Sequence, residues 1–595
     1  MNPKIRCVCL VSVFAIVGLG VPKCALGQEP ANKVLAHQLA IATGQAKRQQ
    51  HEQVVSSGVI HTLLLASGAI ESQANASKNS PIHTPASASV GCPNVFQGPI
   101  SNTRVNQDCS LRRQAEEVIA VNPTDPDNLI AGQNDSRIGF NHCGYDFSFD
   151  GGKTWGDQLP PFFQFIGGDG HTFDACSDPT ATFDNAGNAY VGGILFDVVA
   201  IPSAIVVAKS NAGIGGAFYH TPATVPFQTY RDTPLGVATS DNDPNVANDK
   251  PLITADAGAG SPKKNNVYAT WTRFAITTSG IGIHSPIYFS QSTDGGATWS
   301  PGIEISGANS GFCTIGSGEA NPNACDQDQG SDPVVGPDGT IYVSFFNGNT
   351  PIPGVNQHMI VSCPPAADCS SQASWTAPVQ IVADIGVQPV GPDPVSGCPG
   401  GRQCLPPNGY RIDDATFGSL SVDNNGTLYH VFSDFRNGVN GNCTFFVANP
   451  APPCDQDVFY SFSKDGGATW SAPFKLTPPA SAQWMPWGAV VPDGSALYVT
   501  YYDRSYGLCE FTGCNDITLA TISNPTAAAP SIKYTRVTTS SMPNLVIANN
   551  PIEAGFLGDY MWVTVGRHNR ANVVWADTRG LNGAVEEDIY FATVP

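Results

Sequence analysis

The chain has 595 residues, and only 13% of them are charged. This length and composition allow a large hydrophobic core and are unlike those of disordered proteins. The formal net charge of −20 argues against nucleic acid as a partner, because a phosphate backbone is bound by clusters of lysine and arginine. An anionic sugar can still bind where arginines converge locally.

The first 27 residues have the features of an export signal. Lys4 and Arg6 give a charged start, an apolar stretch follows, and small residues precede a predicted cleavage before Gln28. The apolar stretch is too short for a comfortable membrane span. We therefore predict a signal peptide at residues 1–27, a secreted protein (extracellular or periplasmic) and no membrane span.

Cysteine number points to disulfides. Three of the 17 cysteines lie in the predicted signal, which leaves 14, an even number in an exported chain. No C-x-x-C pair points to zinc. Sequence alone does not determine connectivity, but neighbours along the chain suggest local bridges. The predicted pairs are Cys92 with Cys109, Cys143 with Cys176, Cys313 with Cys325, Cys363 with Cys369, Cys398 with Cys404, Cys443 with Cys454, and Cys509 with Cys514.

Residues 28–90 are predicted to form an arm in front of the compact domain. The first part is rich in Ala and Gln, and the apolar run from Val59 to Ile70 predicts one or two helices. Residues 72–90 turn to Ser, Ala, Asn and Pro, which is typical of a flexible linker. The compact domain is therefore placed at residues 91–595.

A phrase of two strands recurs along this domain. A first strand, often opened by an acid, leads through Asp-Gly, Asn-Gly or Asp-Pro turn residues into a strand rich in Val and Tyr, as in DPVVGPDGTIYVS at residues 332–344. Seven copies predict a β-propeller of seven blades in preference to six, with the preceding segment completing the last blade; stacked sandwiches are the alternative. The copies begin near Glu117, Asp178, Asp249, Asp332, Phe417, Trp487 and Asp559.

In three of these units a third strand carries one eight-residue word, S-x-D-G-G-x-T-W, at residues 148–155, 292–299 and 463–470. Asp-Gly-Gly favours a hairpin turn, because Asp bonds to its own backbone and glycine adopts positive φ. The word resembles the Asp-box (BNR) repeat of the sialidase-like β-propellers, where it forms a structural turn. The resemblance implies an all-β, sialidase-like propeller behind a short N-terminal helical and linker arm. The corresponding structural residues are Asp150, Trp155, Asp294, Trp299, Asp465 and Trp470.

Arginines follow the second strand in five of the predicted blades. In sialidase-like propellers ligands bind on the face where these loops lie, and a planar guanidinium suits the capture of carboxylate or sulfate. Most of these arginines stand close to an aspartate, so the alternative is that Asp–Arg pairs clip the ring together. The substrate-binding candidates are Arg137, Arg273, Arg436, Arg504 and Arg579.

A ring of acids heads the predicted first strands. These carboxylates either cap backbone N–H groups at the starts of the strands, or line the channel mouth as acid/base groups or as ligands for Ca²⁺. Calcium is the one cofactor considered, and no metal ligand is assigned. The acids are Glu116, Glu117, Asp178, Asp249, Asp332 and Asp559.

Candidate catalytic residues follow from residue type and position alone. Sialidases use a tyrosine nucleophile and an aspartate acid/base, and Tyr502 and Asp503 stand together, with Asp434 and Asp577 at equivalent places. The Phe/Tyr-Arg-Ile-Pro motif of sialidases does not precede the first Asp box. No catalytic residue is therefore carried over from that family, and whether the chain is an enzyme is left open.

Two functions remain open at this stage. The first is a secreted propeller that acts on or recognises carbohydrate, such as an exo-acting glycoside hydrolase on acidic sugars. The second is a non-catalytic propeller that binds glycan or protein at the cell surface. In both cases the expected partner is a carbohydrate or glycoconjugate, and the expected state is a monomer.

Overall fold

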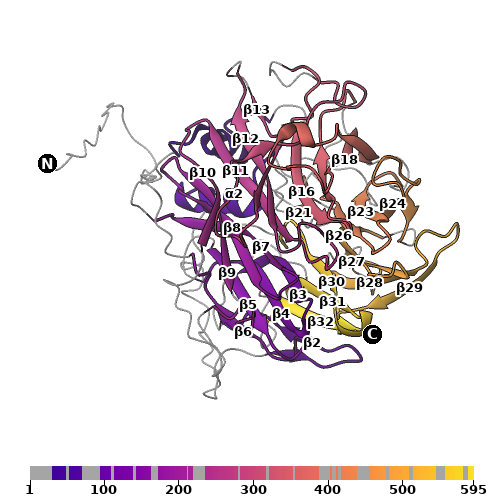
Figure 1. Cartoon of the computed structure of the whole chain (residues 1–595). Coiled ribbons are helices and arrows are strands. Elements are labelled where there is room, and N and C mark those ends of the chain that lie inside the picture. Colours follow the sequence, from indigo (N-terminus) through magenta and orange to yellow (C-terminus); the bar gives the residue numbers. More distant parts are fainter. Residues whose placement is uncertain are drawn as a thin grey trace, which may run out of the picture.

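The structure is a computed structural model of the whole chain (Figure 1). The residues that it describes are 30–48, 52–69, 94–108, 113–137, 142–162, 172–210, 212–218, 235–278, 280, 282–315, 321–352, 355–386, 403–404, 411–412, 417–437, 456–477, 481–507, 509, 514–543, 557–580 and 587–595.

Seven antiparallel sheets form the blades of a propeller, which confirms the predicted fold and blade number. Figure 1 follows the chain around the ring, from the indigo and purple strands of blade 1 to the yellow strands of blade 7. In blades 1 to 6 the chain runs from the innermost strand outwards. Blade 1 contains β3 (Gln114–Asn122), β4 (Asp125–Asp135), β5 (His142–Ser148) and β6 (Gly156–Gln158). Blade 2 contains β7 (Ala175–Phe183), β8 (Ala189–Phe196), β9 (Ser203–Ser210) and β10 (Leu235–Asp241). Blade 3 contains β11 (Val246–Ala255), β12 (Val267–Ile276), β14 (Ile287–Ser292) and β15 (Ile303–Glu304), with β13 (Ile283–His284) beside β12.

The second half of the ring repeats this order. Blade 4 contains β16 (Asp328–Val335), β17 (Ile341–Asn347), β18 (Val355–Cys363) and β19 (Val379–Ile385), and blade 5 contains β22 (Ser419–Val422), β23 (Leu428–Asp434), β24 (Asp457–Ser463) and β25 (Phe474–Lys475). Blade 6 contains β26 (Gln483–Val490), β27 (Ala496–Asp503), β28 (Asp516–Ser523) and β29 (Ser531–Arg536). Blade 7 contains β30 (Trp562–Val565), β31 (Ala571–Asp577), β32 (Asp588–Val594), β2 (Asn102–Arg104) and β1 (Val95–Phe96). A separate hairpin pairs β20 (Gln403–Cys404) with β21 (Arg411–Ile412).

Burial follows the position of each strand in its blade. The second strand β17, with the sequence IYVSFFN, is buried along its whole length, because a middle strand is covered on both faces by neighbouring blades. The outer strand β29 keeps exposed and half-buried positions. The repeated apolar runs of the sequence are therefore the middle strands of the blades.

The ring is closed by the segment that precedes blade 1. In blade 7, β2 pairs with β32, where Thr103 lies opposite Phe591 and Arg104 opposite Tyr590. The predicted pairing between the N-terminal segment and the last strand is confirmed. This pairing covers the edge of β32, and the two-residue strand β1 becomes the outer edge of blade 7.

The three Asp-box words fold into one type of turn. In the first, the Thr154 N–H and hydroxyl donate to the Asp150 carboxylate at 2.9 and 2.6 Å, and Trp155 Nε1 donates to the Gly152 carbonyl at 3.1 Å. The other two words repeat these contacts. Both oxygens of each Asp-box carboxylate therefore accept hydrogen bonds within its own turn.

Four of the predicted disulfides are present in the structure. Each of the other three predicted pairs includes at least one cysteine outside the described residues. The bridges observed join Cys143 to Cys176, Cys313 to Cys325, Cys363 to Cys369, and Cys509 to Cys514.

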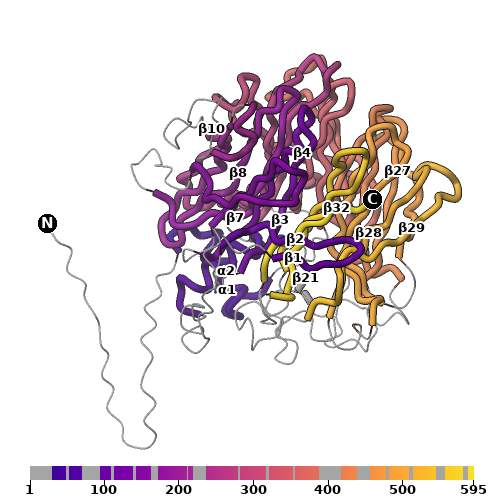
Figure 2. The backbone as a smooth tube through the Cα atoms, turned by 90° about the horizontal axis from the view of Figure 1, so that it is seen from below, coloured from indigo at the N-terminus to yellow at the C-terminus, as the bar shows by residue number. Residues whose placement is uncertain are grey.

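The N-terminal arm contains two helices, α1 (Lys33–Ala42) and α2 (Ser57–Ala66). Both pack on blades 2 and 3 through an apolar cluster that includes Leu35 and Ile60 of the arm and Phe196 and Phe274 of the blades. Figure 2 shows α1 and α2 together on one side of the ring. Neither of them, nor any other helix in the described residues, has the length and apolar character needed to cross a membrane.

Candidate functional site

The candidate arginines lie near the same end of the second strand in blades 1, 3, 5, 6 and 7. Four of them follow the strand by one or two residues, whereas Arg273 lies within β12, three residues before its end. The first strands of the blades begin at the same end of the ring, because neighbouring strands are antiparallel. We call this end of the ring the arginine face. The side chains of Arg137, Arg273 and Arg436 are 17%, 24% and 25% exposed there, whereas Arg504 and Arg579 are buried.

Two of these arginines bind the aspartate two positions before them and also reach a neighbouring blade. Arg436 Nε donates to both oxygens of Asp434 at 2.9 and 2.7 Å, and Arg436 Nη2 donates to the Ala383 carbonyl in blade 4 at 2.6 Å. Arg579 Nη2 donates to Asp577 at 2.6 Å, and its Nη1 donates to a threonine hydroxyl that follows blade 6, at 2.8 Å. These contacts are those of clips between blades.

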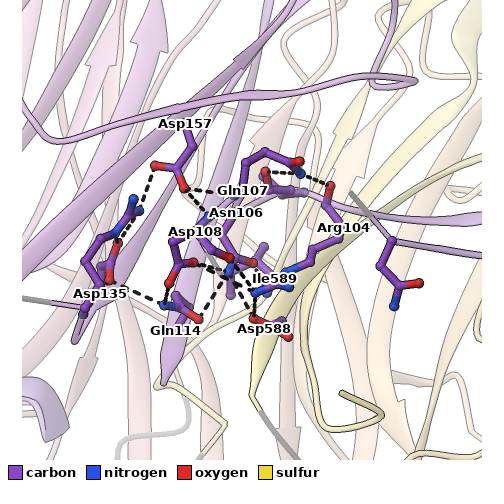
Figure 3. A network of polar contacts seen from close by, with 12 residues as sticks. Arg104, Asn106, Gln107, Asp108, Gln114, Asp135, Asp157, Asp588 and Ile589 are labelled. Carbon is purple, nitrogen blue, oxygen red and sulfur yellow. Dashed lines mark hydrogen bonds and ion pairs between the residues drawn. The ribbon is translucent and has the colours of Figure 1, made fainter. Parts of the chain in front are cut away.

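Arg137 belongs to a larger polar network, shown in Figure 3. Its guanidinium binds the carboxylates of Asp135 and Asp157, the second at 2.7 Å. The other oxygen of Asp157 accepts the backbone N–H groups of Gln107 and Asp108 at 2.8 and 3.0 Å. Burial raises the pKa of Asp135 to about 6, against the lowering effect of the guanidinium. Arg137 thus ties blade 1 to the segment that closes the ring.

The same network reaches blade 7. Arg104 Nη2 and Asn106 Nδ2 donate to Asp588 Oδ1 at 2.5 and 3.0 Å, and the Ile589 N–H donates to Asn106 Oδ1 at 2.9 Å (Figure 3). Arg104 and Asp588 are both fully buried. The closing strand β2 is therefore held by a buried ion pair as well as by backbone pairing.

Arg273 and Arg504 have other surroundings. Arg273 Nη2 donates to Asp241 at 3.4 Å, and the guanidinium lies 5.2 Å from the centre of the Tyr288 ring. Arg504 is only 1% exposed, and its guanidinium lies 5.2 Å from the centre of the Trp484 ring. Of the two, Arg273 presents the more accessible guanidinium.

Tyr502 and Asp503 lie inside the protein. The Tyr502 hydroxyl donates to the Ala576 carbonyl of blade 7 at 3.1 Å, and burial raises the pKa of this phenol well above its usual value. Asp503 accepts hydrogen bonds from Thr518 Oγ1 and Gln483 Nε2 at 2.7 and 3.1 Å. Tyr502 and Asp503 are consecutive residues of β27, so their side chains point to opposite faces of blade 6 and do not form one site. Asp434 and Asp577 lie at the matching ends of the second strands of blades 5 and 7.

Three of the candidate aspartates have a carboxylate partner that the sequence analysis missed. Each stands directly opposite an aspartate at the start of the third strand, and side chains in such cross-strand positions are about 5 Å apart at Cβ. Burial raises the pKa of Asp434 to about 6, with its own arginine acting in the opposite direction. The sequence signal for these pairs was the aspartate at the start of the third strand in blades 5, 6 and 7. The pairs are Asp434 with Asp457, Asp503 with Asp516, and Asp577 with Asp588.

The mouth of the central channel contains a lysine that the sequence analysis also missed. Lys250 is buried, binds Asp559, and lies 3.9 Å from a Glu116 oxygen and 3.7 Å from an Asp178 oxygen. Burial alone would lower the pKa of Lys250, but the carboxylates around it, which include Asp249, raise it well above its usual value. We call these five residues the channel cluster.

Local backbone geometry turns these side chains inward. Glu116, Asp178 and Lys250 have φ of 61°, 53° and 51°, and each falls where the pairing of the first and second strands shifts register. A bulge of this kind redirects one side chain out of the sheet. The only sequence signal for Lys250 was its place directly after Asp249 in a first strand.

The remaining acids of the ring bind backbone groups. Asp332 Oδ2 accepts from the Leu420 N–H of blade 5 at 2.7 Å, and Glu117 Oε1 accepts from the Ala576 N–H of blade 7 at 3.0 Å. In the part of the chain that the structure describes, no group of three or more metal-ligating side chains is arranged to hold a metal ion. The calcium hypothesis therefore has no site among these residues.

The channel opens at the end of the ring opposite the arginine face. There the second halves of the first strands of all seven blades surround a cavity of about 490 Å³. Trp487 and Trp562 line this cavity and stack with their ring centres 3.7 Å apart. This cavity is distinct from the arginine face.

Comparisons with solved structures give several propellers among enzymes that act on carbohydrate. A PL25 ulvan lyase is 10% identical, with a TM-score of 0.42 and coverage of 81% of this chain and 94% of that chain. The intramolecular trans-sialidase from Ruminococcus gnavus is 12% identical, with a TM-score of 0.36 and coverage of 81% and 94%. The GH93 α-L-arabinofuranosidase of Fusarium graminearum is 11% identical, with a TM-score of 0.40 and coverage of 73% and 99%.

No family model matches the sequence, and no curated protein matches it either. At these identities and TM-scores the likenesses carry no argument about the site. The assignment of the fold stands on the strand pairings of this chain.

Proposed function

We propose that this protein is a secreted propeller that recognises carbohydrate on its arginine face. One observation carries the proposal: Arg137, Arg273 and Arg436 lie near the same end of the second strands of their blades, and each contacts an aspartate while 17–25% of its side chain stays exposed. An Asp–Arg pair offers donors and acceptors together, which suits sugar hydroxyls because they both donate and accept hydrogen bonds. Side chains held in place before binding lose little entropy when the ligand arrives.

The paired charges favour binding over hydrolysis. A guanidinium whose charge is balanced by its own aspartate attracts an anionic sugar less than a free one would, and the net charge of −20 opposes anionic polymers at long range. Sugar hydroxyl groups are therefore the main contacts in this proposal. The four disulfides support an oxidising compartment outside the cytosol.

A glycoside hydrolase on acidic sugars is the second candidate, and Asp434 favours it. Its pKa of about 6 suits proton transfer near neutral pH, and Asp457 stands opposite it. The same Asp–Asp arrangement recurs in blades 6 and 7, where each carboxylate is occupied by structural hydrogen bonds. A feature repeated in three blades is better explained as part of the fold than as one catalytic centre.

A binding screen with matched variants tests the proposal. The purified protein is assayed against sialosides, uronate oligosaccharides and neutral oligosaccharides, with affinity and released sugar measured together. We expect binding without turnover, and Arg436→Ala should weaken it by about 1.5–3 kcal/mol. Arg567→Ala is the control, because Arg567 is 57% exposed and pairs with Asp127 at the opposite end of the ring.

Three outcomes would change this assignment. Equal affinity in the two arginine variants would place the sugar elsewhere. Release of sugar that disappears in Asp434→Asn would favour the hydrolase. Absence of binding to every member of the panel would remove the carbohydrate proposal.

A further inference from the structure

The N-terminal arm crosses the channel mouth on the arginine face. The carbonyl of Val54 accepts from Gln329 Nε2 of blade 4 at 2.7 Å. The backbone N–H and the hydroxyl of Ser57 donate to the two oxygens of Asp559, which precedes blade 7, at 3.0 and 2.7 Å. Residues 54–57 are buried, and they bridge blades that lie far apart around the ring.

The next carboxyl group of the mouth contacts both the arm and another acid of the channel cluster. The Ser56 N–H donates to Asp249 Oδ2, and the Asp249 side chain also shares a hydrogen bond with the side chain of Asp178. Burial, and then the charge of Asp178, raise the pKa of Asp249 well above its usual value. Sugar hydroxyl groups both donate and accept hydrogen bonds and therefore suit such a pair of carboxyl groups, whereas the Ser56 N–H can only donate.

We infer that Asp249, Lys250 and Asp559 form a binding site for a polyhydroxyl ligand, and that residues 54–57 of the arm occupy this site as an internal competitor. The Ser57 hydroxyl on Asp559 takes the place of a ligand hydroxyl, and the Lys250 ammonium supplies further donors beside it. The inference rests on the proposed function in its choice of a sugar as the ligand. It adds a second site, separate from the exposed arginines, that the chain itself keeps closed.

The rest of the arm holds the competitor in place. Asn32 caps α1 and donates to the Val246 carbonyl of blade 3 at 2.6 Å, and the Ala31 N–H donates to the Val199 carbonyl of blade 2 at 2.7 Å. The arm also belongs to the same chain as the ring, so its effective concentration at the mouth is high. A ligand for the mouth must therefore bind the fraction of molecules in which the arm has moved away, and its apparent affinity is reduced by that fraction.

A charge placed on the arm tests this arrangement. Ser57→Glu puts a carboxylate against Asp559 and should displace the arm, whereas Ser67→Glu places the same residue at the C-terminal end of α2, away from the mouth. Release is measured by amide hydrogen exchange of α1 and α2. Opening of the mouth is measured, without any sugar, as acetylation of Lys250 by an N-hydroxysuccinimide ester, detected by mass spectrometry.

The expected result has three parts. Ser57→Glu should expose Lys250 to acetylation, raise affinity for a member of the oligosaccharide panel by about 10-fold or more, and lose that gain when combined with Asp249→Asn. Ser67→Glu should behave as the unmodified protein. An open mouth with unchanged sugar affinity would overturn the inference, while Arg436-dependent binding by the unmodified protein would still support the proposed function.

A locked variant covers the case in which Ser57→Glu unfolds the ring. Ala31→Cys with Val199→Cys joins the arm to blade 2 at a point where the two backbones are already hydrogen-bonded. This variant should fold, leave Lys250 unacetylated, and bind the ligand of the mouth at least about 10-fold more weakly than the unmodified protein. Equal binding by the locked and unmodified proteins for every sugar of the panel would show that the arm is a structural plug and overturn the inference.

Discussion

Asp332 of blade 4 accepts a hydrogen bond from the backbone N–H of Leu420 in blade 5 at 2.7 Å. Asp178 of blade 2 makes the same kind of contact with the Lys250 N–H of blade 3, at 3.1 Å. Carboxylates in the middle of the first strands, and not at their starts as the sequence predicted, thus connect successive blades near the channel. Both carboxylates lie inside the protein, and for Asp332 the cost of burying a charge makes protonation part of the stability of the ring.

The first prediction concerns Asp332. Burial raises its pKa from 3.8 to about 7, with the Leu420 N–H acting in the opposite direction. A carboxyl with a raised pKa in the folded state binds its proton more tightly there than in the unfolded chain. Its stabilising contribution is complete below pH 4 and is lost as the pH rises through about 7. Asn cannot ionise, so Asp332→Asn should not lose stability as the pH rises. Its free energy of unfolding at pH 8 should therefore exceed that of the unmodified protein, by at most about 4 kcal/mol.

The measurement is the free energy of unfolding of both proteins between pH 4.5 and 8. Asp338→Asn, at an exposed turn of the same blade, is the control and should leave the pH dependence unchanged. Parallel curves for the unmodified protein and Asp332→Asn would contradict the prediction.

The second prediction concerns two histidines buried between blades 4 and 5. The rings of His358 and His430 lie 4.8 Å apart, and neither nitrogen of His430 has a hydrogen-bond partner among the described residues. Burial, and then His358, lower the pKa of His430 well below 6.5. The unfolded chain therefore takes up a proton that the folded protein refuses, so stability falls as the pH drops below 6.5.

His430→Leu should cost little at pH 8, since no hydrogen bond is lost. Below pH 6.5, the free energy of unfolding of His430→Leu should rise relative to that of the unmodified protein by about 1.4 kcal/mol for each pH unit. Unfolding by denaturant at pH 7.5, 6 and 5 measures this gain. His568→Asn is the control, because His568 is exposed, and it should show no such gain at low pH. If the difference in free energy of unfolding between His430→Leu and the unmodified protein is the same at all three pH values, the His430 imidazole is not buried in its neutral form.

The third prediction concerns Arg137, which binds Asp135 and Asp157 at once. Arg137→Ala leaves both carboxylates buried without their cation, and the loss of one partner of a buried pair costs about 3–5 kcal/mol. We expect a lower melting temperature and faster hydrogen exchange in β2, because Asp157 also holds the segment after that strand. Arg137→Lys keeps the charge but not the planar guanidinium, so its melting temperature should lie between those of the unmodified protein and Arg137→Ala. An unchanged melting temperature in Arg137→Ala would refute the role of this arginine as a clip.

The fourth prediction compares equivalent glycines in two Asp-box turns. Gly152 and Gly467 have φ of 83° and 88°, so alanine is strained at both. A Cβ on Gly152 would lie 2.1 Å from the Phe591 ring of blade 7, whereas a Cβ on Gly467 would come no nearer than 3.4 Å to Ile360 and 3.6 Å to Leu428. Gly152→Ala should therefore cost about 2–4 kcal/mol and Gly467→Ala about 1 kcal/mol. Equal melting temperatures for the two variants would mean that the Phe591 ring moves aside freely.

Much of the fold could be predicted because its signals are local. A hairpin turn depends on a few neighbouring residues such as Asp150 and Gly152, and a strand depends on a short run of apolar residues. Short loops also made nearest-neighbour disulfides the natural expectation, as between Cys363 and Cys369. The seven copies of the two-strand phrase then predicted the number of blades and the need for an N-terminal segment to close the ring.

The candidate site was predicted only in part. The positions of Arg436 and Asp434 at the end of a second strand followed from the repeated pattern, and so did the alternative that they bind each other. Their burial and their partners did not follow, because these depend on which loops and neighbouring blades surround them. The Ala383 carbonyl that Arg436 binds belongs to blade 4, and nothing in the local sequence points to it.

By itself, the sequence determined the turns, the strands, the blade count and the local disulfides of this protein, since each of these arises from residues close together in the chain. Only the tertiary structure decided the state of the channel mouth. Lys250 meets Asp559 across 309 positions, and Ser57 meets Asp559 across 502. Whether a carboxylate at the mouth is open to a ligand, paired with a cation or covered by the arm depends on these distant contacts, because Coulomb attraction and desolvation act through space and not along the sequence.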